Sequence, residues 1–345
     1  MNPVSARLLN QQLICPQFTS SHDVVEWMGA MQAQDYRMMR WAVAMRTRRP
    51  SMKAFEKDFN EGRIVRTHLF RTTWQLVAGE DLVWMLELCR EPAMRGLRGW
   101  MKTNGVFIPE AEQAAVQQVF VDVLEKNRTA LKSDFAAALE DRGMAMPDQR
   151  LSYNIRLAEY SGLICSGDLL PLKKSYALVA EKLPQAGALP REDSLALLAR
   201  KYFRSHGSAT LQDFAWWSGL GLNACSAGIT ALGPELLRVR WKGLDFYIHR
   251  DSRTRGFRSG CVHLLPPYDE YLIGYKSRHV SLHPDHSHRA HNNSGIFWPV
   301  ILLDGEVVGN WSAPSGKVSV DLFHDGADID EENLRKEINR YKKFI

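Results

Sequence analysis

The feature that most constrains the fold is a recurring order of short helices followed by a pair of strands. The copy over residues 109–179 is the clearest. Residues 109–126, 133–142 and 149–161 place apolar side chains at helical spacing, and each stretch ends near a residue that stops helices. Two β-type stretches then complete the copy. Three short helices followed by a hairpin is the winged-helix arrangement, whose third helix commonly enters the major groove of DNA.

Two further copies of this order are expected, one on each side of the first. Residues 191–249 predict three helices and a hairpin, and residues 4–77 predict a similar set. In the latter, helices are expected at 4–12, 22–31 and 51–61, and strands at 63–69 and 72–77. Beyond residue 261 the pattern changes to strands at 296–303, 306–311 and 318–323, followed by a helix over 330–343.

The sequence therefore predicts an α+β protein of tandem winged-helix motifs with a small C-terminal β-rich domain. The expected domains are a first winged helix at 1–90, a second at 91–185, a third at 186–260, and the β-rich domain at 261–345.

Composition limits the class of protein. Hydrophobic residues make up 45% and charged residues 24%, as in soluble globular proteins, and no apolar run reaches the ~20 residues of a membrane span. The N-terminus lacks the apolar core of a signal peptide, so a cytoplasmic protein is expected. The net charge of +5 permits nucleic-acid binding without requiring it. The scattered cysteines and irregularly spaced histidines fit no metal site, so neither a metal nor another cofactor is expected.

Several short phrases, taken in order, resemble the winged-helix DNA glycosylases of the AlkZ/YcaQ type. They cover almost the whole chain. The phrases are Met-Gln-Ala-Gln-Asp at 31–35, Arg-Thr at 66–67 with Arg-Thr-Thr at 71–73, residues 206–220, residues 264–270, and Asp-Gly-Glu-Val-Val-Gly-Asn-Trp at 304–311.

The resemblance implies tandem winged helices around a basic channel and the removal of bulky N-alkylated purines, including cross-linked ones, from double-stranded DNA. Gln32 and Gln34 match the Gln-x-Gln catalytic motif of the AlkZ-like members. Gln75 stands where the family often has a histidine, which puts the range of substrates in doubt. A monomer associated with the nucleoid is expected.

The chemistry fits two glutamines. A purine alkylated at N7 or N3 is already cationic and leaves readily, so the main task is to place a water at C1′. Glutamine cannot act as a base, but its carbonyl oxygen can accept a water proton and fix the water. Gln32 and Gln34 share a face only on an extended segment, so a loop or strand is expected there.

The basic residues of the first hairpin allow two interpretations. Arg63, Arg66, His68 and Arg71 can grip phosphates or enter a minor groove. Alternatively, they form a solvated basic strand or pair internally with Asp58 or Glu61.

Two other groups of residues also carry alternatives. Gln149 and Arg150, with Tyr153 and Asn154, are expected to be exposed on the third helix of the middle copy, where they contact DNA or pack within the protein. Tyr268 and Asp269 form a possible pocket with Gln75, while Asp269 can instead cap a helix.

Two other functions remain open from the sequence. The alternative to a monofunctional DNA glycosylase is a non-catalytic winged-helix DNA-binding protein such as a transcription regulator. A third possibility is a protein that has this fold and acts on something other than DNA, but no sequence motif supports it.

Overall fold

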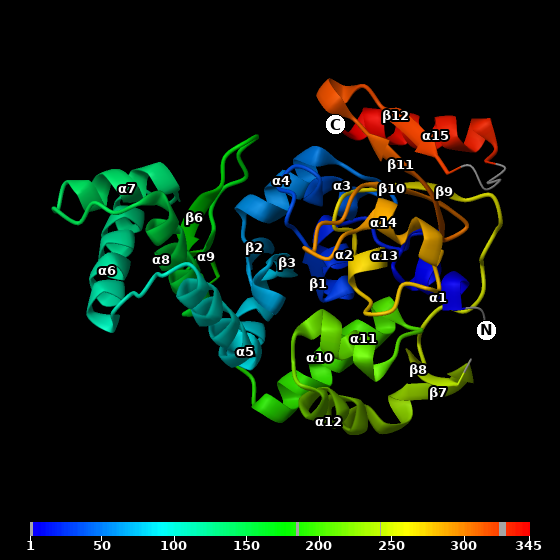
Figure 1. Cartoon of the computed structure of the whole chain (residues 1–345), viewed down its shortest axis with the longest axis horizontal. Coiled ribbons are helices and arrows are strands. Elements are labelled where there is room, and N and C mark those ends of the chain that lie inside the picture. Colours follow the sequence, from blue (N-terminus) through cyan, green and yellow to red (C-terminus); the bar gives the residue numbers. More distant parts are fainter. Residues whose placement is uncertain (1–2, 184–185, 242, 324–328) are drawn as a thin grey trace. The chain divides into compact units, whose positions relative to one another are not determined.

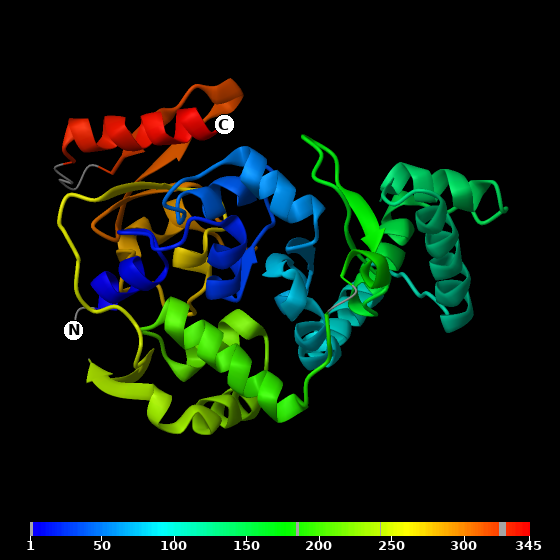
Figure 2. The same ribbon diagram turned by 180° about the vertical axis from the view of Figure 1, so that it is seen from behind.

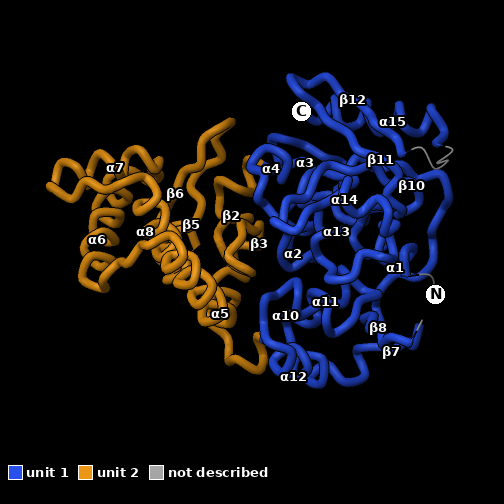
Figure 3. The backbone as a smooth tube through the Cα atoms, viewed as in Figure 1, with its two compact units in different colours: residues 1–55, 195–345 blue, residues 56–194 orange. Residues whose placement is uncertain are grey.

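The computed structural model describes residues 3–183, 186–241, 243–323 and 329–345. The chain forms two compact units, coloured separately in Figure 3. Unit 1 consists of residues 1–55 and 195–345, and unit 2 consists of residues 56–194. Unit 1 is therefore built from two distant parts of the sequence.

The first part of unit 1 contains three short helices, one strand and the start of a fourth helix. These are α1 (Pro3–Asn10), α2 (Ser21–Met28), β1 (Ala30–Gln32), α3 (Met39–Ala44) and α4 (Met52–Asn60). The helix expected over 22–31 ends at Met28, because Gly29 adopts a φ of 77° and turns the chain into β1. A Cβ on Gly29 would lie 3.0 Å from the Cβ of Lys201, so this turn favours glycine sterically as well.

The second part of unit 1 begins with three helices and a hairpin, in the order expected from the sequence. They are α10 (Arg191–His206), α11 (Leu211–Ser218), α12 (Leu222–Leu232), β7 (Leu236–Trp241) and β8 (Leu244–His249). The hairpin is antiparallel, with Leu236 opposite His249 and Trp241 opposite Leu244. Residue 242, in its predicted turn, lies outside the described residues.

Unit 1 ends in an antiparallel sheet of order β12-β11-β10-β9 and a terminal helix (Figure 1). The elements are β9 (Val262–Leu265), α13 (Glu270–Ile273), α14 (Ser287–Ala290), β10 (Val300–Leu303), β11 (Glu306–Ser312), β12 (Ser319–Leu322) and α15 (Glu331–Phe344). Figure 2 shows α15 beside this sheet from behind. The three strands expected after residue 261 are thus present, together with β9.

This sheet shares one core with the N-terminal helices. Leu8 of α1 and Trp41 of α3 belong to the same buried cluster as Leu264, Ile301 and Tyr341. The Trp41 indole donates a hydrogen bond to the Leu264 carbonyl at 2.8 Å. The sheet face is apolar and is covered by residues from the other end of the chain, so residues 261–345 are not a separate body.

Unit 2 opens with a hairpin and a long helix. Strands β2 (Ile64–His68) and β3 (Trp74–Ala78) pair antiparallel, and α5 (Leu82–Thr103) follows. The domain boundary expected after residue 90 falls inside α5, so residues 56–90 continue into the elements that follow. The boundary expected after residue 185 lies outside the described residues.

The rest of unit 2 has the element order expected for the middle copy. The elements are α6 (Glu110–Lys126), β4 (Ala130–Leu131), α7 (Lys132–Glu140), α8 (Asp148–Tyr160), β5 (Ile164–Ser166), β6 (Ser175–Leu178) and α9 (Val179–Lys182). The strands form an antiparallel sheet of order β4-β6-β5. Phe135 packs 4.3 Å from Phe120 and 5.7 Å from Tyr176 between ring centroids, which joins the helices to the sheet.

Two properties of the described residues bear on function. None of their helices is both long and apolar enough to cross a membrane. Nor do three or more His, Cys, Asp or Glu side chains gather there in a metal-binding group.

Candidate active site

The Gln-x-Gln segment lies at the end of β1 in unit 1. Gln32 is the last residue of the strand and is 5% exposed, whereas Gln34 lies in a bend and is exposed. Ala33 between them is buried. The segment is therefore non-helical at this point, as the pairing of two glutamines on one face requires.

Glu270 fixes the backbone of this segment. Its Oε1 accepts a hydrogen bond from the backbone N–H of Gln32 at 2.5 Å, although the two residues are 238 positions apart in the chain. Its Oε2 accepts a bond from the Trp217 indole at 3.1 Å and lies 3.2 Å from His206 Nε2. The carboxyl group is 2% exposed, so it acts inside the unit as a fixed acceptor.

His206 is enclosed on every side. Its ring stacks on Tyr202 with centroids 4.7 Å apart, and Ser205 Oγ lies 2.8 Å from Nδ1. Burial lowers the pKa of His206, and this effect outweighs the opposing attraction of Glu270. The imidazole is therefore neutral at neutral pH and supports Glu270 as a hydrogen-bonding partner.

Asp269 has a structural role of the kind that the sequence left open. Its Oδ1 accepts a bond from the Tyr271 amide at 2.9 Å and so caps α13. Both of its oxygens also bind the Arg46 guanidinium, at 2.7 and 2.9 Å, and both side chains are buried. Tyr268 beside it has a φ of 60° and is half-buried, and burial together with Asp35 raises its pKa.

Glu270 ends the motif at residues 264–270, but the sequence alone indicates no role for it. A helix start in which Glu is followed by Tyr-Leu-Ile leaves no polar face, and all four residues of α13 are buried. An acidic residue in such an apolar context signals a specific buried partner. That partner belongs to a distant part of the sequence, which periodicity does not reveal.

The first hairpin, in unit 2, buries two of the expected DNA-contacting residues. Arg66 is 1% exposed, with its guanidinium carbon 3.7 Å from the centroid of the Trp74 ring. His68 is 2% exposed, and its Nδ1 lies 2.5 Å from Glu159 Oε2. Burial lowers the pKa of His68. Arg66 is therefore not exposed for direct contact with a phosphate, which corrects the expectation of a basic face, whereas His68 lines a cavity described below.

The remaining residues of this hairpin differ in exposure. Arg63 forms an ion pair with Asp58 at 3.1 Å, the internal alternative that the sequence allowed. Arg71 is half-buried with a φ of 53°. Gln75 is 1% exposed and donates to the Thr73 hydroxyl at 2.9 Å.

Helix α8 packs within unit 2 along most of its surface. Gln149 is exposed, but Arg150 forms a two-point ion pair with Glu112. Tyr153 and Asn154 are 5% and 0% exposed, so the expectation that they lie on an exposed face is wrong. Helix α8 contacts α5, α6, β2 and β5, as the packing alternative requires.

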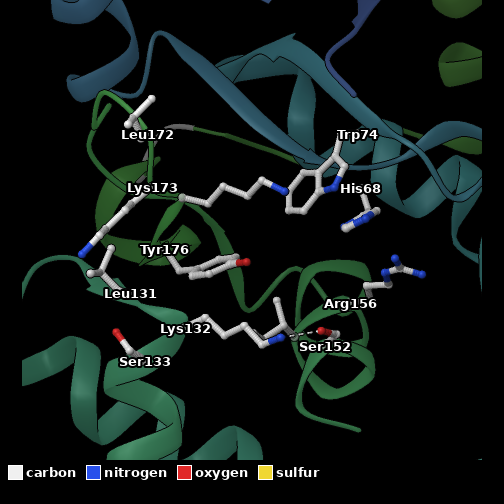
Figure 4. A pocket seen from close by; sticks show the side chains of 12 residues that line it. His68, Trp74, Leu131, Lys132, Ser133, Ser152, Arg156, Leu172, Lys173 and Tyr176 are labelled. Carbon is white, nitrogen blue, oxygen red and sulfur yellow. Dashed lines mark hydrogen bonds between the residues drawn. The ribbon is translucent and has the colours of Figure 1, made fainter. Parts of the chain in front are cut away.

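A basic cavity of about 540 Å³ lies in unit 2 and was not expected from the sequence (Figure 4). We call it the lysine cavity. Its basic residues are Lys132 of α7, Arg156 of α8, and Lys173 and Lys174 of the loop before β6. Lys132 pairs with Asp148 at 2.6 Å and donates to Ser152 at 2.7 Å.

Electrostatics favour an anion in the lysine cavity. Burial, then the positive charges of Arg66 and Arg156, lower the pKa of Lys174 despite the opposing Glu159. Among the described residues, no carboxylate forms an ion pair with Lys174, Lys173 or Arg156. The doublet of lysines just before a predicted strand was the available sequence signal.

Comparisons with known proteins identify the class of protein to which this fold and the Gln-x-Gln segment belong. The family model described as DNA glycosylase AlkZ-like matches residues 25–344, and the chain belongs to this family. This result confirms the resemblance carried by the sequence motifs.

Two similar proteins come from Streptomyces sahachiroi. An interstrand DNA cross-link repair glycosylase is 23% identical over 334 residues, which span 92% of this chain and 89% of the relative. The solved structure of DNA glycosylase AlkZ superposes with a TM-score of 0.81 at 20% identity, covering 99% of this chain and 96% of that one. This structural likeness establishes a shared fold.

Proposed function

We propose that this protein is a monofunctional DNA repair glycosylase that hydrolyses the N-glycosidic bond of N-alkylated purines, including those in interstrand cross-links. Gln32 and Gln34 position the attacking water. The observation that carries the proposal is the Gln-x-Gln segment at the end of β1, anchored by buried Glu270, in a chain of the AlkZ-like family.

The reaction depends more on the position of the attacking water than on acid catalysis. An alkylated purine departs as a neutral base, because the alkyl group has already placed a positive charge on it. A water held at C1′ then meets a sugar that develops oxocarbenium character. The side-chain carbonyls of the two glutamines accept hydrogen bonds from this water, and orientation alone can remove a large share of a barrier.

Double-stranded DNA is the proposed partner, and the lysine cavity is a proposed contact for its phosphates. Lys132, Lys173, Lys174 and Arg156 supply the charge there in place of buried Arg66, and His68 also lines the cavity. Arg71 and the exposed Gln149 stay candidates for further contacts.

The test is single-turnover release of N7-methylguanine from duplex DNA, with DNA affinity measured in parallel. Gln32→Ala and Gln34→Ala each slow excision by at least about tenfold, equivalent to roughly 1.4 kcal/mol of lost transition-state stabilisation. Gln34→Asp retains activity, because a carboxylate also accepts a water proton. DNA affinity stays unchanged, since phosphate contacts dominate binding.

Gln17→Ala is the matched control, since Gln17 is an exposed glutamine of the same unit. It excises at the wild-type rate. Wild-type rates in both alanine variants at positions 32 and 34 would exclude the assignment of the glutamines. An inactive wild-type protein that still binds DNA would instead favour a non-catalytic DNA-binding protein.

A further inference from the structure

A second cavity, of about 600 Å³, lies in unit 1 and contains a buried arginine. We call it the Arg7 cavity. It is lined by α1, the beginning of α11, β8 and the segment 276–291. Neither Gln32 nor Gln34 lines it. Its volume lies within the ~300–1,000 Å³ typical of small-molecule sites.

Arg7 is a buried cation that faces this cavity. The side chain is 1% exposed, and its Nε donates to the Ser208 carbonyl at 3.1 Å. Its guanidinium carbon lies 3.6 Å from the centroid of the Tyr275 ring. In the part of the chain that the structure describes, no carboxylate forms an ion pair with Arg7. Buried charges are normally paired, so an anion in the cavity would complete this site.

The acid that lines the cavity is already occupied. Asp213 is 1% exposed, and its oxygens accept bonds from the amide and hydroxyl of Thr210 and from the amides of Lys276 and Ser277. These donors are all neutral groups, and they hold the carboxylate in place at the start of α11. Lys276 and Arg278 add positive charge to the lining.

Part of the lining is apolar. It includes Phe246 and Leu244 of β8 together with Val280, Leu282 and Pro284. Leu244 is 53% exposed and lies at the rim, whereas Phe246 is 4% exposed and lies inside. A site with one buried cation and an apolar wall selects a ligand that has both an oxyanion and an apolar body.

We propose that the Arg7 cavity binds a small organic anion, a carboxylate or phosphate monoester, whose oxyanion pairs with Arg7 and whose apolar body packs on Phe246 and Leu282. A phosphate within duplex DNA does not fit, because the duplex cannot enter a cavity that buries the guanidinium almost completely. The proposal is independent of the glycosylase reaction, since it concerns a different cavity and is tested by binding alone.

The probes are three naphthalene compounds of similar shape: the carboxylate, the phosphate monoester and the neutral carboxamide. Calorimetry with the full chain measures each affinity. At least one anion binds with one-to-one stoichiometry, and the carboxamide binds at least about tenfold more weakly, because it cannot form a charge-assisted pair. The anion that binds more tightly identifies the headgroup.

Two variants test the cavity by different routes. Arg7→Met removes the charge while keeping most of the volume, and it weakens anion binding by at least about tenfold. Leu244→Asp places a negative charge at the exposed rim, weakens the same binding, and does not depend on altering a buried residue. Leu222→Asp is the matched control, because Leu222 is 52% exposed, lies in the same unit and does not line the cavity.

The proposal fails if neither anion binds the wild-type protein more tightly than the carboxamide. It also fails if Leu244→Asp and a folded Arg7→Met both bind the anions as the wild type does. An Arg7→Met variant that does not fold leaves Leu244→Asp against Leu222→Asp as the deciding comparison. Loss of binding in Leu222→Asp as well would contradict the assigned location.

Discussion

Glu270 is the residue that ties the Gln-x-Gln segment to the rest of unit 1. Its carboxyl group accepts hydrogen bonds from the backbone N–H of Gln32 and from the Trp217 indole, and it lies beside His206. Both of its oxygens are in use, and exchanging either for a donor leaves a buried polar group without its partner. The position of Gln32 therefore depends on a side chain that does not itself reach the reacting atoms.

Glu270→Gln is expected to affect both stability and excision. The amide keeps one acceptor oxygen where the carboxyl group has two, so the free energy of unfolding falls by about 1–3 kcal/mol. Excision slows by at least about tenfold under conditions where the variant is folded, because small displacements of a positioning group are costly. Denaturant melts and single-turnover release of N7-methylguanine measure the two effects.

The control for this prediction is Glu235→Gln. Glu235 pairs with Arg200 and His249 in the same unit but is partly exposed. The Glu235→Gln substitution is expected to lower the free energy of unfolding modestly and to leave the rate of excision unchanged. A Glu270→Gln variant that loses stability yet excises at the wild-type rate would restrict Glu270 to a purely structural role.

At the scale of single residues, the sequence predicts some features of the site correctly and others wrongly. The two-residue spacing of the glutamines correctly predicted a non-helical segment, and Asp269 was correctly offered as a helix cap. Arg66 and His68 were placed on a common face, but alternation does not tell whether that face meets solvent. All five residues of β2 are buried, because unit 2 covers both faces of the strand.

At the scale of elements, physical reasons explain why helix α5 was not predicted and why one face of helix α8 was predicted wrongly. Helix α5 contains Pro92, Gly96 and Gly99, residues that usually interrupt a helix. Its buried residues nevertheless hold it together over 22 residues. The polar side of helix α8 was predicted to be exposed, but Tyr153 and Asn154 are covered, because α8 packs against other elements of unit 2, among them α5 and α6.

The loop between β5 and β6 contains Lys173 and Lys174, which are expected to contribute to DNA binding. Lys173→Ala combined with Lys174→Ala weakens binding to duplex DNA and lowers the salt dependence of that binding by about one unit per lost phosphate contact. The measurement is fluorescence anisotropy over a range of salt concentrations. Stability changes by no more than about 1 kcal/mol, since among the described residues neither lysine forms an ion pair and Lys174 loses only its cation–π contact with Trp74.

Lys126→Ala serves as the control, because Lys126 is exposed on α6 of the same unit and does not line the lysine cavity. Its affinity and salt dependence match those of the wild type. If the paired loop variant binds DNA with an unchanged salt dependence, the lysine cavity is not a phosphate contact.

Considered as a whole molecule, the protein is expected to be sensitive to acid. Burial lowers the pKa values of His68, His206 and His263, the last to about 3, where Arg340 and Arg46 add to the effect. The unfolded chain takes up protons on these residues below about pH 6.5, whereas the folded chain does not. Stability is therefore complete above that pH and is lost as the pH falls below it.

His263 allows this expectation to be tested. From pH 7 to pH 5, a histidine with these two pKa values removes about 2 kcal/mol of stability. His263→Leu therefore shows a smaller loss over this interval, by about that amount, in urea melts. His288→Leu, at an exposed position, loses as much as the wild type. Equal pH dependence in both variants would show that His263 titrates alike in the folded and unfolded chains.

The division of unit 1 into two distant parts sets an order of events on the ribosome. Residues 1–55 emerge first but cannot complete their core until residues 195–345 have been synthesised, while unit 2 is continuous and can fold in between. The bond from Gln32 to Glu270 spans 238 positions and forms only after Glu270 has been synthesised. Nascent or truncated chains that stop before Glu270 therefore carry the Gln-x-Gln segment without its anchor, and the candidate active site is assembled only after residues 195–345 have emerged.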